Sequence, residues 1–293
     1  MKTDKISVKN LLKQHNIRPN KIMGQNFLID EGVVDQMIKA ANLSKKDVVL
    51  EVGPGLGGLT EKLAQKAKKV IAVEKDKRII EVLKETLKNY ENVEIVHGDI
   101  LNILETTFAK KAISAPKKIV ANIPYYLTSH LVRKLLESGN PPQTIILLMQ
   151  KEVAERICPP RRARSSGEAG AIPPKMNLLA VSVQIYSHPE ILYYIPKQSF
   201  WPKPKVDSAI IKISNIQKPR GIDIKKFFKL VKAGFSSPRK QLANNLSKKL
   251  RIDKEETKKA LIELGFDAQI RAERLTVNDW AMLLAHFTGT KSL

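Results

Sequence analysis

The chain has little cysteine, few histidines and no long apolar run, and each shortage excludes a class of protein. Its single cysteine, Cys158, excludes an internal disulfide, and its five histidines show no spacing typical of metal ligands. No stretch approaches the roughly 18 apolar residues of a membrane-spanning helix, and the start of the chain has no apolar signal core. We therefore expect a cytoplasmic protein that needs no metal.

Acidic residues are also scarce relative to basic ones. The chain has 29 Asp and Glu against 51 Lys and Arg, a formal charge of +22. The excess is concentrated near the end, where residues 218–256 hold twelve Lys and Arg against four Asp and Glu. Heat-adapted proteins are also rich in Lys, but there Glu rises together with Lys, which it does not here. A large positive charge creates an electrostatic field that attracts phosphate groups, so the composition favours a nucleic acid partner.

A glycine-rich loop follows a strand that we expect over residues 48–52. The β-branched run ends at Val52 and passes directly into Gly53-Pro54-Gly55-Leu56-Gly57-Gly58, which apolar residues at helical spacing follow. Glycines let a backbone approach a ligand closely, and the free N–H groups of a helix start face it. The next strand ends at Glu74, about 20 residues on, where a carboxylate can accept hydrogen bonds from ribose hydroxyls. The pattern predicts a nucleotide-type cofactor at Gly53, Gly55 and Glu74.

A third strand, expected over residues 93–96, is followed by Asp99, which can accept from the adenine amine of a cofactor. Taken singly, such a carboxylate is more often simply solvated. The spacing of Gly53, Gly55 and Gly58 also satisfies the dinucleotide fingerprint. The glycines alone therefore leave an NAD-dependent dehydrogenase open.

The next expected strand, residues 118–121, ends in Asn122-Ile123-Pro124-Tyr125. Amine methyltransferases place this tetrapeptide against an exocyclic nitrogen, although an ordinary turn before proline would also fit it. The N6 amine of adenine is a poor nucleophile because its lone pair is delocalised into the ring. The Asn122 oxygen and a carbonyl at Ile123 or Pro124 would accept from the amine and aim its lone pair at a methyl donor. Tyr125 would stack on the base. A dehydrogenase gives this motif no role, so we favour S-adenosylmethionine as the cofactor.

Five segments together resemble the KsgA/RsmA family of ribosomal RNA small-subunit adenine N6,N6-dimethyltransferases, and the resemblance covers nearly the whole chain. They are Gly24-Gln25-Asn26-Phe27-Leu28, Glu51-Val52-Gly53-Pro54-Gly55-Leu56-Gly57, Gly98-Asp99, Asn122-Ile123-Pro124-Tyr125-Tyr126 and Phe200-Trp201-Pro202-Lys203-Pro204-Lys205-Val206-Asp207-Ser208. The resemblance implies an α/β fold, a Rossmann-like class I methyltransferase domain followed by a small α-helical domain. A polar, broken stretch over residues 215–221 places the boundary, so we expect a methyltransferase domain over 1–215 and a helical RNA-binding domain over 216–293.

The resemblance also implies the substrates and a set of site residues. The methyl donor is S-adenosylmethionine, and the acceptors are two adjacent adenosines in a hairpin near the 3′ end of small-subunit rRNA. Asn26, Leu28, Gly53, Glu74, Asp99 and Asn122 would line the donor site, with residues 26–28 folded over the donor. Phe200 or Trp201 can close the other face of the target base, although either aromatic can equally be part of the core.

Two basic segments are candidates for RNA contacts. Arg239 and Lys240 lie in a stretch that resembles the basic helix entry of the family, although Pro238 stands where an arginine is commoner. Residues 158–174 are rich in Pro, Gly, Ser and Arg and form a longer loop than is usual in the family. Arg161, Arg162 and Arg164 would bind phosphates if this loop orders on RNA, but we favour a tolerated insertion.

Two further alternatives stay open. An Erm-type large-subunit rRNA methyltransferase shares the first domain, whereas the 200–208 motif and the Ala243–Leu246 region favour the small-subunit enzyme. A non-catalytic ribosome assembly or transcription factor of the same fold would not need the intact set of Gly53, Glu74, Asp99 and Asn122. We expect a monomer that acts on small-subunit rRNA, within an assembling particle, and that makes no membrane contact.

Overall fold

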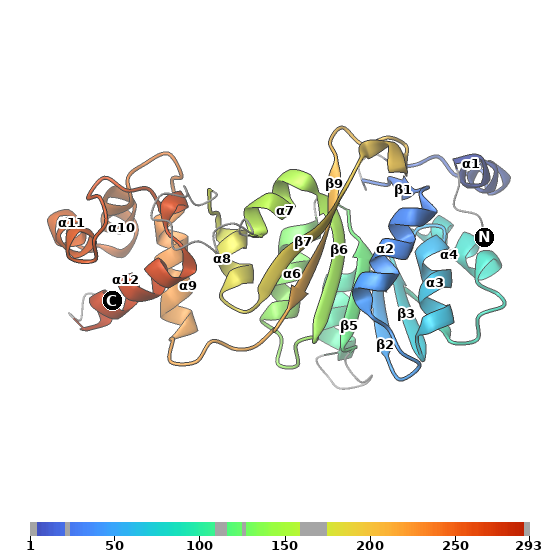
Figure 1. Ribbon diagram of the computed structural model, residues 1–293, viewed down its shortest axis with the longest axis horizontal. Helices are drawn as coiled ribbons and strands as arrows, with labels where there is room; N and C mark the ends of the chain where they lie inside the picture. The colour runs from blue at the N-terminus through green and yellow to red at the C-terminus, as the bar shows by residue number, and fades with distance from the viewer. Residues whose placement is uncertain (1–4, 21–23, 109–115, 125–126, 159–174, 290–293) are drawn as a thin grey trace. The chain divides into compact units, whose positions relative to one another are not determined.

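The computed structural model describes residues 5–20, 24–108, 116–124, 127–158 and 175–289 (Figure 1). The chain divides into two compact units, residues 1–154 with 187–217 and residues 155–186 with 218–293. The first unit ends close to the boundary expected at residue 215, but residues 155–186 group with the second unit. The assignment of methyl transfer to one domain and RNA binding to the other stays a prediction.

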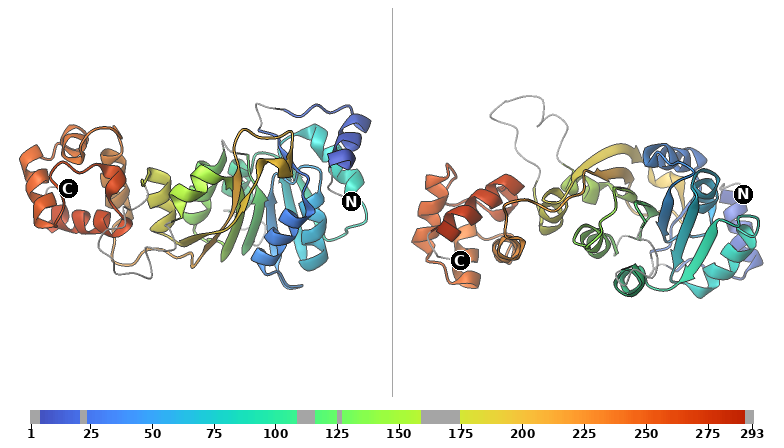
Figure 2. Two further views of the ribbon diagram at one scale, coloured as in Figure 1. Left: turned by 45° about the horizontal axis from the view of Figure 1, so that its top comes forward. Right: turned by 90° about the horizontal axis from the view of Figure 1, so that it is seen from below.

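The first unit is built on a seven-stranded sheet of order β4-β3-β2-β5-β6-β9-β7 (Figures 1 and 2). The parallel strands are β2 (Val48–Val52), β3 (Lys69–Glu74), β4 (Val93–His97), β5 (Lys118–Asn122) and β6 (Thr144–Gln150). The antiparallel strands are β7 (His188–Ile195) and β9 (Ser208–Ser214). The chain leaves β2 toward β3 and later returns to its other side as β5. In sheets of this kind a ligand binds outside the carboxyl ends of the strands, at this switch point.

Helices connect the strands, and several begin at an acidic cap. The helices of the first unit are α1 (Lys5–Gln14), α2 (Glu31–Ala41), α3 (Gly58–Lys66), α4 (Lys77–Thr86), α5 (Ile100–Ile103), α6 (Thr128–Leu136) and α7 (Lys151–Ile157), whose last turn belongs to the second unit. A π-helical turn over Leu104–Phe108 extends α5. Asp30, Asp76 and Asp99 cap α2, α4 and α5 by accepting from backbone N–H groups of the first turn.

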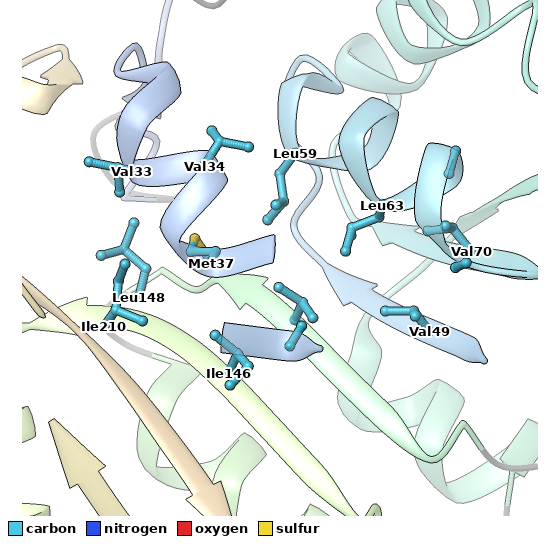
Figure 3. Packing of buried hydrophobic residues seen from close by; sticks show 14 of the residues in the cluster. Val33, Val34, Met37, Val49, Leu59, Leu63, Val70, Ile146, Leu148 and Ile210 are labelled. Atoms are coloured by element: carbon cyan, nitrogen blue, oxygen red, sulfur yellow. The ribbon is translucent and has the colours of Figure 1, made fainter. Parts of the chain in front are cut away.

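Both faces of the sheet are buried, which is why its parallel strands read as continuous apolar runs. On one face α2 and α3 pack against the sheet (Figure 3). The labelled contacts there are made by Val33, Val34, Met37, Val49, Leu59, Leu63, Val70, Ile146, Leu148 and Ile210. The alternate residues of β5 and β6 are equally buried, among them Ile119, Ala121, Ile145, Leu147 and Met149.

A second, two-stranded sheet joins the N-terminal motif to the 200–208 motif. β1 (Phe27–Leu28) pairs antiparallel with β8 (Phe200–Trp201), so that Leu28 lies opposite Phe200. Just beyond this pair, the Ser199 hydroxyl donates to Asp30 Oδ2 at 2.8 Å. Two motifs that lie about 170 residues apart in the sequence are thereby neighbours in the fold.

The second unit is helical. It contains α8 (Leu178–Gln184), α9 (Ile224–Gly234), α10 (Leu242–Leu250), α11 (Lys254–Glu263) and α12 (Val277–Gly289), and a short 3-10 turn at Ala272–Arg274. Another 3-10 turn, at Lys197–Ser199, belongs to the first unit. Its middle segment is tied to the C-terminal helices: the Met176 N–H donates to the Glu273 carbonyl at 2.9 Å, and Tyr186 stacks on Phe228. Within the described part of the chain, no helix is long and apolar enough to cross a membrane.

Candidate active site

A cavity of about 130 Å³ opens at the carboxyl ends of the central strands. Its lining combines the N-terminal motif, the glycine-rich loop and the residues that follow β3, β4 and β5. The polar or glycine residues among them are Gly24, Gln25, Asn26, Glu51, Gly53, Gly55, Gly58, Glu74, Lys75, Gly98, Asp99 and Asn122, and Leu28, Pro124 and Phe200 also line it. The structure thus brings together the cofactor-site residues expected from the sequence.

The glycine-rich loop forms one wall of the cavity. Gly53 and Gly55 have positive φ angles of 69° and 58°, which side chains other than glycine rarely adopt. A Cβ atom on Gly55 would lie 3.4 Å from the Phe27 ring, and one on Gly53 would lie 3.8 Å from the Asn122 carbonyl. The Gly53 N–H donates to the Val73 carbonyl at 3.0 Å and fixes the loop against β3. The loop therefore leaves backbone surface bare for a ligand.

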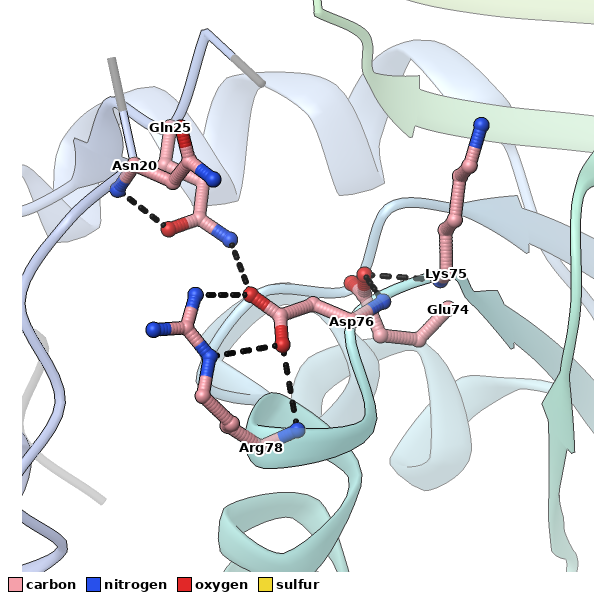
Figure 4. A network of polar contacts seen from close by, with 6 residues as sticks. All are labelled: Asn20, Gln25, Glu74, Lys75, Asp76 and Arg78. Carbon is pink, nitrogen blue, oxygen red and sulfur yellow. Dashed lines mark hydrogen bonds and ion pairs between the residues drawn. The ribbon is translucent and has the colours of Figure 1, made fainter. Parts of the chain in front are cut away.

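Glu74 ends β3 with its carboxylate held in place (Figure 4). Its Oε1 accepts from the backbone N–H groups of Lys75 and Asp76, both at 2.8 Å. Burial raises the pKa of Glu74, and these N–H groups oppose that shift because they stabilise the charged form. A carboxylate with one oxygen fixed by the backbone is suited to accept hydrogen bonds from a ribose diol at the other.

A polar network ties the N-terminal motif to the residues after Glu74 (Figure 4). Gln25 accepts from the Asn20 N–H at 2.8 Å and donates through Nε2 to Asp76 Oδ2 at 3.0 Å. Asp76 also pairs with Arg78, whose guanidinium holds the pKa of this carboxyl below its usual value. The network keeps residues 24–28 beside the cavity. Sequence reasoning missed Gln25 and Asp76, although Asp76 stands at a recognisable helix cap.

Asp99 is engaged by the chain on both of its oxygens. Oδ1 caps α5 by accepting from the Leu101 N–H at 2.9 Å, and Oδ2 pairs with Lys75 Nζ at 2.9 Å. The pairing with Lys75 is the main cause of the lowered pKa of Asp99. Asp99 is therefore ionised at neutral pH and available as an acceptor for an adenine amine. Lys75, which sequence reasoning also missed, shares that carboxylate.

Glu51 is a buried carboxyl group in the wall of the cavity, with 1% of its surface exposed. Its Oε2 makes no hydrogen bond of good geometry among the described residues, although the Thr60 hydroxyl lies near enough to oppose the effect of burial on the pKa. Burial raises the pKa of Glu51 to about 8, so the group is mostly neutral at pH 7 and can donate a hydrogen bond. A buried polar atom without a good hydrogen bond at the edge of a cavity fits a site built to receive a polar ligand.

Asn122 lies at the end of β5, where its side chain meets the N-terminal motif. Its Nδ2 lies 3.5 Å from the Asn26 carbonyl, and Asn26 Nδ2 donates to the Gly24 carbonyl at 3.2 Å. This orientation of the Asn122 amide leaves Oδ1 as an acceptor. The Pro124 carbonyl accepts from the Leu127 N–H at 3.0 Å, where α6 begins.

The expected stacking and RNA-binding residues are placed only in part. Phe200 lines the cavity, but it is 4% exposed and packs in the cluster formed with α2 and α3. Tyr125 lies outside the described residues, as do Arg161, Arg162 and Arg164.

Arg239 and Lys240 are exposed in the turn between α9 and α10 of the second unit. Asn245 holds that turn by donating through Nδ2 to the carbonyls of Gly234 and Ser237, at 2.6 and 3.0 Å.

Together, the parallel sheet with its antiparallel end, the glycine loop, the carboxylates after β3 and β4 and the asparagine after β5 define a Rossmann-like, S-adenosylmethionine-dependent methyltransferase. A model of the family described as ribosomal RNA adenine dimethylase matches residues 16–288. The chain belongs to this family, whose members use S-adenosylmethionine as the methyl donor.

Individual relatives agree with this assignment. The ribosomal RNA small subunit methyltransferase A of Dehalococcoides mccartyi is 38% identical over 282 residues, which covers 96% of this chain and 92% of the relative. The protein of the same name from Listeria innocua is 37% identical and covers 96% of both chains.

Two solved structures share the fold. A dimethyladenosine transferase from Plasmodium falciparum superposes with a TM-score of 0.69 at 27% identity, over 89% of this chain and 97% of the other. The 23S rRNA methyltransferase ErmE superposes with a TM-score of 0.66 at 25% identity, over 90% of this chain and all of the other.

Proposed function

We propose that the chain transfers two methyl groups to N6 of each of two adjacent adenosines in a hairpin near the 3′ end of small-subunit rRNA. The observation that carries the proposal is Asn122, which ends β5 at the cavity that Glu74 and Asp99 also line. The names of relatives such as those from Dehalococcoides and Listeria support a small-subunit target. The similarity to ErmE makes large-subunit rRNA the second candidate.

In this proposal the cavity holds S-adenosylmethionine, which supplies an electrophilic methyl group when bound. Glu74 accepts from the ribose hydroxyls, and Asp99 accepts from the adenine amine. Gly53 and Gly55 bring bare backbone against the donor, and Asn26 and Leu28 close over it. The neutral Glu51 adds a hydrogen-bond donor without placing a second uncompensated negative charge in the wall.

On the acceptor side, Asn122 and one backbone carbonyl orient the target amine. Asn122 Oδ1 accepts one amine hydrogen. Because the Pro124 carbonyl already accepts from Leu127, the Ile123 carbonyl is the better second acceptor. The two acceptors draw the nitrogen toward tetrahedral geometry and aim its lone pair at the methyl group. The methylated amine is then a cation whose proton is acidic enough for water to take, so the site needs no strong base. Tyr125 and Phe200 are proposed to enclose the base.

The setting of the reaction is a further part of the proposal. The charge of +22 fits an RNA partner, and the names of the relatives fit an acceptor in the small ribosomal subunit. We propose that the chain acts as a monomer, in the cytoplasm, on an assembling small subunit.

Methylation of isolated RNA tests the target. We expect purified protein and S-adenosylmethionine to convert two adjacent adenosines of the small-subunit hairpin to the dimethyl form, as measured by mass spectrometry of nuclease fragments. A large-subunit fragment of the same length is the matched control and should stay unmodified. Methylation of the large-subunit fragment alone would reject the proposed target in favour of the second candidate.

Arg239 and Lys240 provide a separate test of RNA binding by the second unit. Replacing both residues with Glu should weaken RNA binding. Each phosphate contact releases counterions from the RNA, so binding releases fewer of them when a contact is lost. The log–log salt slope should then become shallower by about 0.7 to 0.9 per lost contact. The measurement is a titration of fluorescent small-subunit RNA at several salt concentrations. Donor affinity should not change.

The pair Lys258 and Lys259 on α11 is a matched control for charge in the same unit. Replacing these two lysines with Glu should leave the log–log salt slope of RNA binding close to that of the wild-type protein. An equal change of slope in both double variants would show that the RNA responds to net charge and not to the α9–α10 turn.

A further inference from the structure

β7, the outermost strand on one side of the sheet, carries an exposed tyrosine near the end of the sheet where the cavity lies. Tyr194 is 56% exposed, which is unusual for a large aromatic side chain in a strand. Its neighbour Tyr193 is 37% exposed and pairs with Ile210, whose side chain lies in the cluster beneath α2. Because side chains alternate along a strand, the two tyrosines lie on opposite faces of the sheet.

The surroundings of Tyr194 are basic and structurally fixed. Lys151 Nζ, at the start of α7, lies 5.1 Å from the centre of the Tyr194 ring. The Lys151 N–H donates to the Asp207 carbonyl at 3.0 Å, and the Lys197 N–H donates to Asp207 Oδ1 at 3.0 Å. These hydrogen bonds join the start of α7 to the segment that enters β9. They fix the backbone of Lys151, whose ammonium group lies over the Tyr194 ring.

Positive charge continues along the segment between β7 and β9. Lys197, Lys203 and Lys205 lie there with Asp207 as the segment's one acidic residue, and Lys203 and Lys205 are exposed. Glu152, next to Lys151, is also exposed. The segment includes Phe200, which lines the cavity. The surface is thus continuous, along the chain, with the site.

The register of the sheet places this surface at the same edge as Asn122. Asn122 pairs with Leu148 of β6, Gln150 of β6 pairs with Ser208 of β9, and Ser208 pairs with Ile195 of β7. Three strand spacings separate β5 from β7, roughly 14 Å, which a few nucleotides can span. An aromatic ring with lysines beside it is the combination that binds single-stranded nucleic acid, because bases stack on the ring and phosphates pair with the ammonium groups.

We propose that Lys151, Tyr194, Lys197 and Lys205 form an RNA-binding surface, here called the Tyr194 surface, that holds a nucleotide flanking the target adenosine. A base stacks on Tyr194 while Lys151 contacts its phosphate. The surface acts in substrate positioning and has no part in donor binding. The proposal rests on the proposed function, because it takes the RNA substrate as given.

The test compares Tyr194→Ala with Tyr193→Ala, a matched control on the opposite face of the same strand. Binding of fluorescent small-subunit RNA should weaken about thirtyfold for Tyr194→Ala, the middle of the range for loss of one stacked base, and less than twofold for the control. KM for RNA should rise by a similar factor while kcat and donor affinity stay nearly unchanged. Tyr194→Trp should restore binding, and thermal unfolding of both alanine variants verifies that they fold.

Lys151→Ala separates stacking from charge. It should make the salt slope shallower by about 0.7 to 0.9, whereas Tyr194→Ala should leave the slope unchanged. Equal RNA binding by the two tyrosine variants would overturn the proposal. A defect of Tyr194→Ala seen only with assembled particles, and absent with isolated RNA, would also overturn it and would indicate a protein contact. If the unchanged chain fails to methylate the hairpin, the proposed target is rejected, while the comparison of RNA binding still decides the surface.

Discussion

Replacing Asn122 with alanine should lower methyl transfer about 10²- to 10³-fold, the usual loss when one preorganised polar contact to the reacting group is removed. The expected change in donor affinity is only a few-fold, because Glu74, Asp99 and the glycine loop remain in the cavity. The small loss that we expect there reflects the contact between Asn122 Nδ2 and the Asn26 carbonyl. Single-turnover rates at saturating RNA and donor, with calorimetry of the donor, separate the two effects.

Asn140→Ala is the matched control for this experiment. Asn140 precedes β6 at the opposite edge of the sheet, and its Oδ1 accepts from Lys117 Nζ at 2.7 Å. Its loss removes a side-chain amide and a hydrogen bond without touching the cavity, so turnover should not change. If Asn122→Ala keeps its turnover within a few-fold of the unchanged chain, the motif after β5 is structural and the proposed orientation of the amine is wrong.

Among the described glycines of the second unit, Gly234 is the one whose replacement by alanine should cost the most stability. A Cβ atom at Gly234 would lie 2.3 Å from Trp280 Cη2 and 2.9 Å from Leu242 Cδ1. Trp280 is fully buried and cannot move aside without displacing α12. Alanine is normally better than glycine in a helix by about 1 kcal/mol, but overpacking of this severity typically costs 1–3 kcal/mol or more, so the clash decides the sign.

Urea unfolding of the full chain, followed by tryptophan fluorescence, measures this effect. Gly289→Ala is the matched control, since Gly289 also ends a helix of the second unit and an added Cβ there would meet nothing within 4 Å. We expect that variant to be as stable as the unchanged chain or slightly more stable. Equal stability of the two variants would contradict the packing described around Trp280.

Hydrophobic patterning was enough to predict most of the sheet. Short apolar runs predict the strands β2 to β5, and the structure confirms each of them. The strand β7 was missed because its register shifts between Ile191 and Tyr193, and this irregularity breaks the alternation that marks a strand.

The grouping of residues 155–186 with the C-terminal helices was missed for another reason. It depends on contacts such as Tyr186 on Phe228, which join residues far apart in the sequence.

The sequence predicts the place of those candidate site residues that directly follow a strand. Glu74, Asp99 and Asn122 each stand at or just after a strand end, and parallel strands bring such ends to one edge of a sheet. The partners of these residues could not be predicted in the same way. Gln25 reaches Asp76 across 51 positions of sequence, and the raised pKa of Glu51 follows from its burial, which no local pattern reveals.

The division of the chain into units also has a consequence for how the protein is made. The sheet of the first unit is complete once β9 has been synthesised, at Ser214, whereas residues 155–186 then still lack their partners around Phe228 and Glu273. During synthesis the described part of this middle segment, residues 175–186, stays without these contacts until the C-terminal helices have also been made. A fragment cut at residue 215 would leave it in that state permanently and should therefore aggregate more readily than the whole chain.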